Sequence, residues 1–161
     1  TSYIPTNGAI ATRGADSLLN FGSEQIIDSE SGILFFEGSS QFTDLNRDLF
    51  VDSDNNSFAF IRLRNDSKIN VSLKDGSTND NFFNRDYNYD SSINSKIVLR
   101  WSIGVQELWI NGVAVIEANA QKTINENSLN KIIFRPNSSF QFYGRVRQLK
   151  HLPYNTDITT L

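Results

Sequence analysis

Several residue types are absent or scarce in this chain of 161 residues. It has no cysteine and no methionine, and it contains 3 prolines, 9 glycines and 1 histidine. The absence of cysteine excludes a disulfide scaffold, a thiolate zinc site and a cysteine nucleophile. The chain also lacks any apolar run near the roughly 18–20 residues that span a bilayer, so we expect no membrane insertion.

An excess of positive charge is absent as well. The chain has 15 Lys and Arg against 18 Asp and Glu, a net charge of −3. A surface with this balance attracts no polyanion as a whole, so we expect no nucleic-acid partner. Few aromatics interleave with the basic residues near the C-terminus, which favours a solvated strand face or a salt-bridge surface between subunits over a nucleic-acid site. These residues are Arg145, Arg147, Lys150 and His151.

Aromatic residues are plentiful, with 12 Phe, 5 Tyr and 2 Trp, and short alternating runs recur between turn-forming residues. This pattern predicts an all-β fold, a two-sheet antiparallel sandwich or a barrel. The clearest signal is Asn111-Gly112, which can close a two-residue hairpin. The stretch 75–94 is predicted to be irregular. We expect strands over 16–21, 32–38, 57–64, 68–74, 95–102, 106–110, 113–117, 130–135 and 140–152.

Three segments resemble a known family. The opening TSYIPTNG (residues 1–8), continued by ATRGAD (11–16), is similar to the signature that introduces concanavalin A-like (laminin-G-like) jelly-roll domains of bacteriophage tail and virion proteins. KIVLRW (96–101) with LWING (108–112) resembles their paired strands, and FYGRVRQLKHLP (142–153) resembles their closing strand.

The resemblance implies a two-sheet jelly-roll sandwich and, often, glycan binding. We expect one domain over residues 1–161, cut from a longer protein, at a virion surface or outside the cell. The family does not fix the ligand.

Catalysis is not expected. Hydrolases of this fold class carry E-x-D-x-x-E on one strand, which places a nucleophile and an acid/base about 5–5.5 Å apart, and the chain has no such triplet. The nearest acidic groupings are Asp28 with Glu30, and Glu107 opposite Glu117 on the predicted hairpin. A Ser-His-Asp arrangement would need His151, which lies in a strand of packing side chains.

A calcium loop is the one metal site that the sequence suggests. Asp52, Asp54 and Asn56 have the spacing of alternate oxygen ligands. Ser57 replaces the glycine and Leu63 replaces the glutamate of an EF-hand, which excludes that motif. An Asx-rich turn is the favoured reading, with a looser structural Ca²⁺ site as the alternative. No cofactor is required.

Alternation places Ala59, Ile61 and Leu63 on the core side of one strand and Leu99 and Trp101 on that of another, and it predicts which side chains leave the core. If the central strands share one sheet, its outer face displays an Arg-rich set with two aromatics, which suits a sugar because rings stack on the apolar face of a pyranose and forked donors reach its hydroxyls. Clustered arginines would favour acidic sugars. The alternative is that the cations solubilise the face and Trp109 packs under a loop. The set is Phe60, Arg62, Arg64, Asn70, Lys74, Arg100 and Trp109.

The irregular stretch provides a second candidate surface. Its rings alternate with Asn, Asp and Arg85, as in a lectin or an antibody paratope. We expect Phe82 and Phe83 to plug the edge of the sandwich, which leaves Tyr87 and Tyr89 exposed.

These observations predict a non-catalytic carbohydrate-binding module of a phage tail fibre or other virion protein that recognises a glycan on a bacterial surface, an acidic one included. Two alternatives stay open. One is a structural or decorating virion module that binds no sugar and oligomerises through its parent protein. The other is a binding module appended to a polysaccharide-degrading enzyme.

Overall fold

The computed structural model describes residues 27–40, 47–52, 56–76, 81–90, 92–134 and 144–161. Within these ranges it contains ten strands and one short 3₁₀ helix, η1 (Ile158–Thr160). No helix among them is long and apolar enough to cross a membrane.

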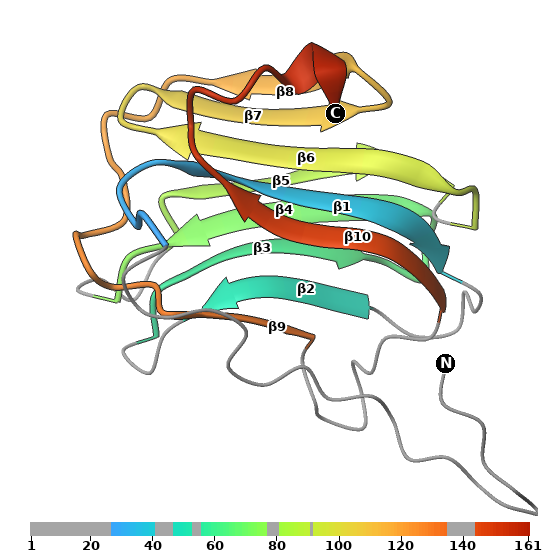
Figure 1. Ribbon diagram of the computed structural model, residues 1–161, viewed down its shortest axis with the longest axis horizontal. Coiled ribbons are helices and arrows are strands. Elements are labelled where there is room, and N and C mark those ends of the chain that lie inside the picture. The colour runs from blue at the N-terminus through green and yellow to red at the C-terminus, as the bar shows by residue number, and fades with distance from the viewer. Residues whose placement is uncertain (1–26, 41–46, 53–55, 77–80, 91, 135–143) are drawn as a thin grey trace, which may run out of the picture.

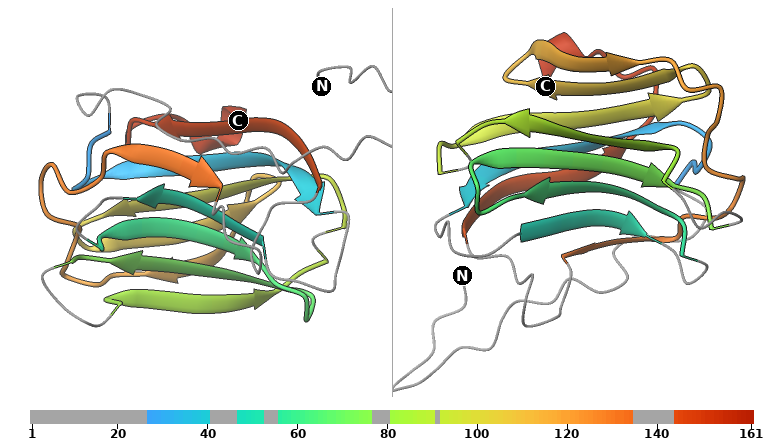
Figure 2. Two further views of the ribbon diagram at one scale, coloured as in Figure 1. Left: turned by 90° about the horizontal axis from the view of Figure 1, so that it is seen from below. Right: turned by 180° about the vertical axis from the view of Figure 1, so that it is seen from behind.

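Two five-stranded antiparallel sheets pack face to face (Figures 1 and 2). Sheet A has the order β10 (Gly144–Leu152), β1 (Gly32–Ser40), β6 (Ser95–Ser102), β7 (Val105–Ile110) and β8 (Val113–Ala118). Sheet B has the order β5 (Phe83–Asn88), β4 (Lys68–Lys74), β3 (Phe58–Leu63), β2 (Arg47–Asp52) and β9 (Lys131–Phe134). The predicted two-sheet sandwich is confirmed.

The sequence pattern missed two strands, β2 and β5. In β2 three of six residues are charged, and β5 has polar residues at four of six positions, so neither shows a run of alternation. The structure therefore replaces part of the irregular stretch predicted over 75–94 with a strand. The strand predicted over 16–21 and the first residues of the one predicted over 140–152 lie outside the described residues.

The main core lies between the sheets and has the composition that alternation predicted. Sheet B contributes Ala59, Ile61 and Leu63 from β3, and β4 adds its own alternate residues. Trp101 on β6 is fully buried, and its indole nitrogen donates to the carbonyl of Ser29 at 3.0 Å. This hydrogen bond satisfies the polar atom of a large buried ring, so Trp101 fixes the loop before β1 as well as the core.

A second apolar cluster lies on the outer face of sheet A. Ile33, Phe35 and Val98 are buried there beneath Ile158 of η1. The segment after β10 turns back over this face (Figure 1). The Lys96 ammonium donates to the main-chain oxygen of Leu161 at 2.7 Å. Part of this outer face is therefore interior rather than surface.

The hairpin between β7 and β8 forms as predicted. Asn111 and Gly112 have φ of 50° and 80°, the left-handed values that a type I′ turn requires. The Asn111 side chain also accepts a hydrogen bond from the backbone of Lys96 at 2.9 Å. The turn thus ties the hairpin to β6.

Candidate functional site

The predicted sugar-contacting residues lie on two faces, not on one. Phe60, Arg62 and Arg64 come from the β3 side of sheet B, whereas Arg100 and Trp109 lie on β6 and β7 of sheet A. The expectation that all of them share one outer face is wrong. Alternation tells which side of its own strand a residue occupies, but it does not tell which sheet the strand joins.

Three of the predicted arginines meet in a polar hollow on sheet B, with a volume of about 390 Å³. The register explains this, because Arg62 pairs with Asn70, and Asn70 pairs with Asp86 across β3, β4 and β5. We call this the sheet B hollow. It is lined by Arg62, Arg64, Asn70, Asn84, Arg85 and Asp86.

Asn70 organises the floor of the sheet B hollow. Its amide nitrogen donates to Asn84 Oδ1 at 2.7 Å, to Asp86 Oδ1 at 2.8 Å and to the Arg85 carbonyl at 3.1 Å. Asn70 is buried, whereas Asn84, Arg85 and Asp86 are exposed. One buried amide therefore fixes the side chains of Asn84 and Asp86 on the open side of the hollow.

Arg64 lies between two carboxylates. It binds Asp66 through two nitrogen atoms, at 2.9 and 2.8 Å, and Asp86 through a third at 3.2 Å. The hydrogen bond to Asp66 raises the pKa of Arg64, and the same contact lowers the pKa of Asp66. The hollow therefore offers fixed hydrogen-bond acceptors beside its cationic donors.

The aromatic residues near the hollow are less accessible than predicted. Phe60 is only 6% exposed, with Phe58 packed beside it at a centroid distance of 5.3 Å and the Arg62 guanidinium 5.2 Å from its ring. Lys74, from the same predicted face, is also buried. Phe60 is thus not an exposed stacking surface, although it points away from the main core.

Tyr87 and Tyr89 also differ from the prediction of exposed loop tyrosines. Because Phe83 points into the core, the two-residue period of β5 directs Tyr87 to the same side, and both tyrosines pack against the main core. The Tyr89 hydroxyl hydrogen-bonds Ser95. Arg85, at the open edge, is exposed as expected, and it donates to the Asn84 carbonyl at 2.8 Å.

Arg100 and Trp109 meet on sheet A, where both contact the carboxylate of Glu107. Trp109 Nε1 donates to Glu107 Oε2 at 2.9 Å, and Arg100 Nη1 lies 3.5 Å from the same oxygen. The Trp109 ring packs against the apolar cluster beneath η1. The structure therefore agrees with the alternative stated from the sequence, in which Trp109 packs under a loop instead of facing a sugar.

The calcium prediction lies mostly outside the described residues. Asp54 and the side chain of Asp52 fall there, whereas Asn56 is an exposed residue with φ of 64° just before β3. The described residues contain no group of three or more His, Asp or Glu side chains that could hold a metal ion. A Ca²⁺ site at Asp52, Asp54 and Asn56 stays a prediction.

His151 is half-buried and packs against the ring of Trp101, at a centroid distance of 5.6 Å. Burial lowers the pKa of its imidazole, and Asp28 nearby offsets only part of this effect. The Nε2 atom has no hydrogen-bond partner in the described part of the chain. The side chain therefore fills space at the end of the core, and no hydroxyl of the described residues is hydrogen-bonded to its Nε2 atom.

Sequence reasoning missed Asn84 and Asp86 as site residues. The signal was present in FNRDYN (83–88), where polar residues alternate with Phe83 and Tyr87. The high polarity of this edge strand concealed its period.

The fold is shared with known jelly-roll domains. CBM40 of the Ruminococcus gnavus IT-sialidase, solved with α2,3-sialyllactose, superposes with a TM-score of 0.60 over 76% of each chain, at 8% identity. Domains LG4-5 of the mouse laminin α1 chain match with a TM-score of 0.57 over 86% of this chain and 38% of that one, at 13% identity. The leech intramolecular trans-sialidase, complexed with 2,7-anhydro-Neu5Ac, matches with a TM-score of 0.60 over 77% of this chain and 21% of that one, at 11% identity. The sequence matches no protein-family model and no curated protein.

Proposed function

We propose that this chain is a non-catalytic carbohydrate-binding module and that its primary site is the sheet B hollow. The observation that carries the proposal is the convergence of Arg62, Arg64 and Arg85 with two amides and a carboxylate in one depression. Sugar hydroxyls both donate and accept hydrogen bonds, and this lining offers both partners in fixed positions.

The floor of the hollow supports binding by preorganisation. Asn84 accepts from Asn70 through its oxygen, which leaves the Asn84 amide nitrogen as a donor toward a ligand. Arg64 is held by Asp66 and Asp86, so little side-chain freedom is lost on binding. We expect a single site of this kind to bind with a Kd of about micromolar to millimolar, with avidity from several copies of the module.

The comparisons support this class of ligand. The CBM40 domain with the same sandwich is solved with a sialyllactose. We propose a polysaccharide or cell-surface glycan as the partner of this chain, without nucleic acid or membrane. A place in a phage tail fibre or other virion protein that recognises bacterial glycans, with oligomerisation through the parent protein, rests on the opening residues 1–16, which lie outside the described residues.

A glycan array followed by calorimetric titration of the best ligand tests the proposal. We expect Asn84→Ala to weaken binding about tenfold, because it removes an amide donor from the hollow. Arg85→Ala should weaken binding less, because the Arg85 guanidinium lies beside the Phe83 ring, 5.7 Å from its centroid. Lys122→Ala, which removes an exposed cation elsewhere, is the matched control. Silence across neutral and acidic glycans, together with a stable oligomer in light scattering, would instead support a structural module.

A further inference from the structure

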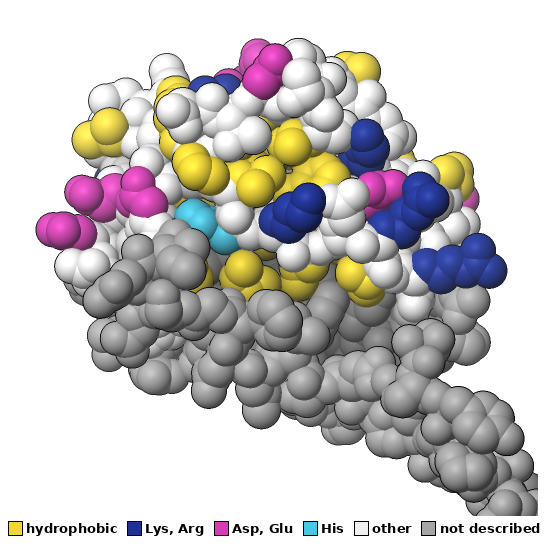
Figure 3. Space-filling model, in the orientation of Figure 1, with side chains coloured by type: hydrophobic (Ala, Val, Ile, Leu, Met, Phe, Trp, Pro, Cys, Tyr) yellow, Lys and Arg dark blue, Asp and Glu magenta, His cyan; other side chains and the backbone are white. Residues whose placement is uncertain are grey.

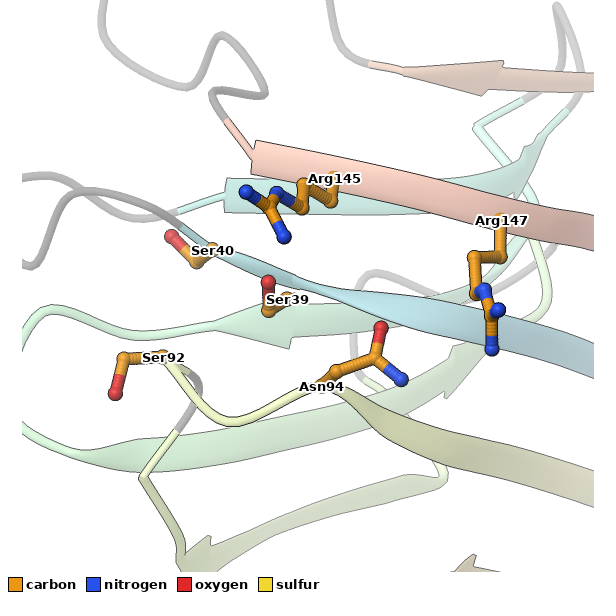
Figure 4. A pocket seen from close by; sticks show the side chains of 6 residues that line it. All are labelled: Ser39, Ser40, Ser92, Asn94, Arg145 and Arg147. Carbon is orange, nitrogen blue, oxygen red and sulfur yellow. The ribbon is translucent and has the colours of Figure 1, made fainter.

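A second pocket lies on the outer face of sheet A, at the first residues of β10. It has a volume of about 580 Å³, within the range of small-molecule sites. In Figure 4, Arg147 reaches from β10 across β1, the Arg145 guanidinium lies on the side of Ser39 and Ser40, and Asn94 lies beyond β1. We call this the Arg145–Arg147 pocket. Its lining residues are Ser39, Ser40, Ser92, Asn94, Arg145 and Arg147.

A bulge between the two strands brings the arginines to this face. Glu37 pairs with Gln148, but the next residue, Gly38, pairs with Val146, so Arg147 is the extra residue of β10. As a result Arg147 and its neighbour Gln148 both reach Glu37, at 3.0 and 3.3 Å. Bulges commonly redirect side chains beside binding sites.

Two glycines allow β1 and β10 to approach closely here. A Cβ atom on Gly38 would lie 2.0 Å from the Arg145 carbonyl oxygen, and one on Gly144 would lie 2.0 Å from that of Ser39. Any side chain at either position would push the strands apart. The two arginines therefore project from a place where the backbones of β1 and β10 lie in close contact.

The charges in this pocket are arranged differently from those in the sheet B hollow. Glu37, with a side chain only 8% exposed, holds Arg147 from one side, while Arg147 itself is 70% exposed. The Arg145 guanidinium and the Asn94 amide have no hydrogen-bond partner among the described residues. None of the described residues that line the pocket carries a carboxylate. Figure 3 shows Lys and Arg gathered toward one end of this face, beyond an apolar patch.

We propose that the Arg145–Arg147 pocket binds the acidic group of an anionic sugar residue, a carboxylate or a sulfate. The two guanidinium groups match the paired oxygens of such a group, and Asn94 and the Ser39 hydroxyl lie where they can reach ring hydroxyls. The choice of a sugar as the carrier of the anion rests on the proposed function. The site itself is separate from the sheet B hollow, since it lies on the opposite sheet.

Titration with 3′-sialyllactose and a sulfated disaccharide, each against lactose, tests this inference. We expect the acidic probes to shift the NMR signals of Asn94 and Ser39 and lactose to leave them unchanged. Arg145→Ala should weaken acidic binding at least about tenfold. Lys150→Ala, an exposed cation on the same strand outside the pocket, should leave it within about twofold. Added salt should weaken this binding, because the attraction is between charges.

Asn84→Ala and Arg85→Ala separate this inference from the proposed function. If both leave the shifts at Asn94 unchanged, the pocket acts on its own, even where the sheet B hollow binds nothing. Equal shifts from lactose and from the acidic probes, or equal losses in Arg145→Ala and Lys150→Ala, would overturn the inference. So would displacement of the acidic sugars by sulfate ion at equal concentration, which would show a site for inorganic anions alone.

Discussion

The Arg100 guanidinium lies over the ring of Tyr154, with its central carbon 4.1 Å from the ring centroid. Arg100 belongs to β6 in the middle of sheet A, and Tyr154 follows the last strand. Because Glu107 also contacts Arg100, the cation joins the hairpin strand β7 to the segment that covers the sheet. The contact thus holds the C-terminal segment over the apolar cluster of Ile33, Phe35 and Val98.

Replacing Tyr154 by alanine should loosen this segment. We expect Tyr154→Ala to lower the free energy of unfolding by about 1–2 kcal/mol, from the lost cation–π contact and lost packing. Urea unfolding followed by fluorescence measures this difference. Tyr154→Phe keeps the ring and should stay close to the wild type. A loss in Tyr154→Phe as large as in Tyr154→Ala would show that the ring contact is not what holds the segment.

Trp109 should matter for stability rather than for glycan binding in the sheet B hollow. Its ring packs beneath η1 and its indole nitrogen is bonded to Glu107. We expect Trp109→Ala to lower the free energy of unfolding by about 2–3 kcal/mol. The glycan affinity of the folded variant, measured by titration, should be unchanged. A folded variant of normal stability that no longer binds glycan would place the sugar on sheet A instead.

Asn70 should affect both stability and binding. Asn70→Ala removes the amide nitrogen that donates to Asn84, Asp86 and the Arg85 carbonyl. We expect it to lower the free energy of unfolding by about 1–3 kcal/mol and to weaken glycan binding. Asn70→Asp keeps the size of the side chain but sets a carboxylate against Asp86. It should be the less stable of the two variants at pH 7 in urea unfolding. Equal stability of the variants would contradict the network described for the floor.

The single histidine gives the chain a distinct pH dependence. Burial lowers the pKa of His151, so below its usual value of about 6.5 the unfolded chain binds a proton that the folded chain does not. The free energy of unfolding should therefore fall as the pH drops below about 6.5, until the folded histidine also protonates. The lowered pKa values of Asp66, Asp90 and Asp157 act only at more acidic pH, because unfolded aspartate titrates near 3.9.

Denaturant unfolding at pH 7.5, 6.5 and 5.5 measures this slope. His151→Gln removes the titrating group and should flatten the profile in this interval, whatever its effect at pH 7.5. A wild-type profile that is already flat between pH 7.5 and 5.5 would show that the imidazole protonates as readily in the folded chain.

The sequence predicted the core better than the site. Alternation identified Ile61, Leu99 and Trp101 as core residues because each strand reports its own buried side. It could not assign β3 and β6 to different sheets, since pairing depends on contacts between segments far apart in the chain. It also could not foresee that Phe60 is covered, because a residue that points away from one core can be buried by other parts of the chain.

The arginines illustrate the same limit. Arg62, Arg64 and Arg85 were predicted from residue type and do meet, whereas Arg100 belongs to a different face. The missing information was the register of β5, whose polar sequence hides its strand character.

The position of β1 between β6 and β10 has a consequence for how the chain folds. Glu37 of β1 and Arg147 of β10 are 110 positions apart, so no local hairpin can deliver either neighbour to β1. During synthesis the apolar strand β1 keeps an open edge until residues 144–152 have emerged. Such distant pairings form slowly, and unpaired edges recruit other chains. Truncation before β10 should therefore produce aggregation rather than a smaller soluble sandwich.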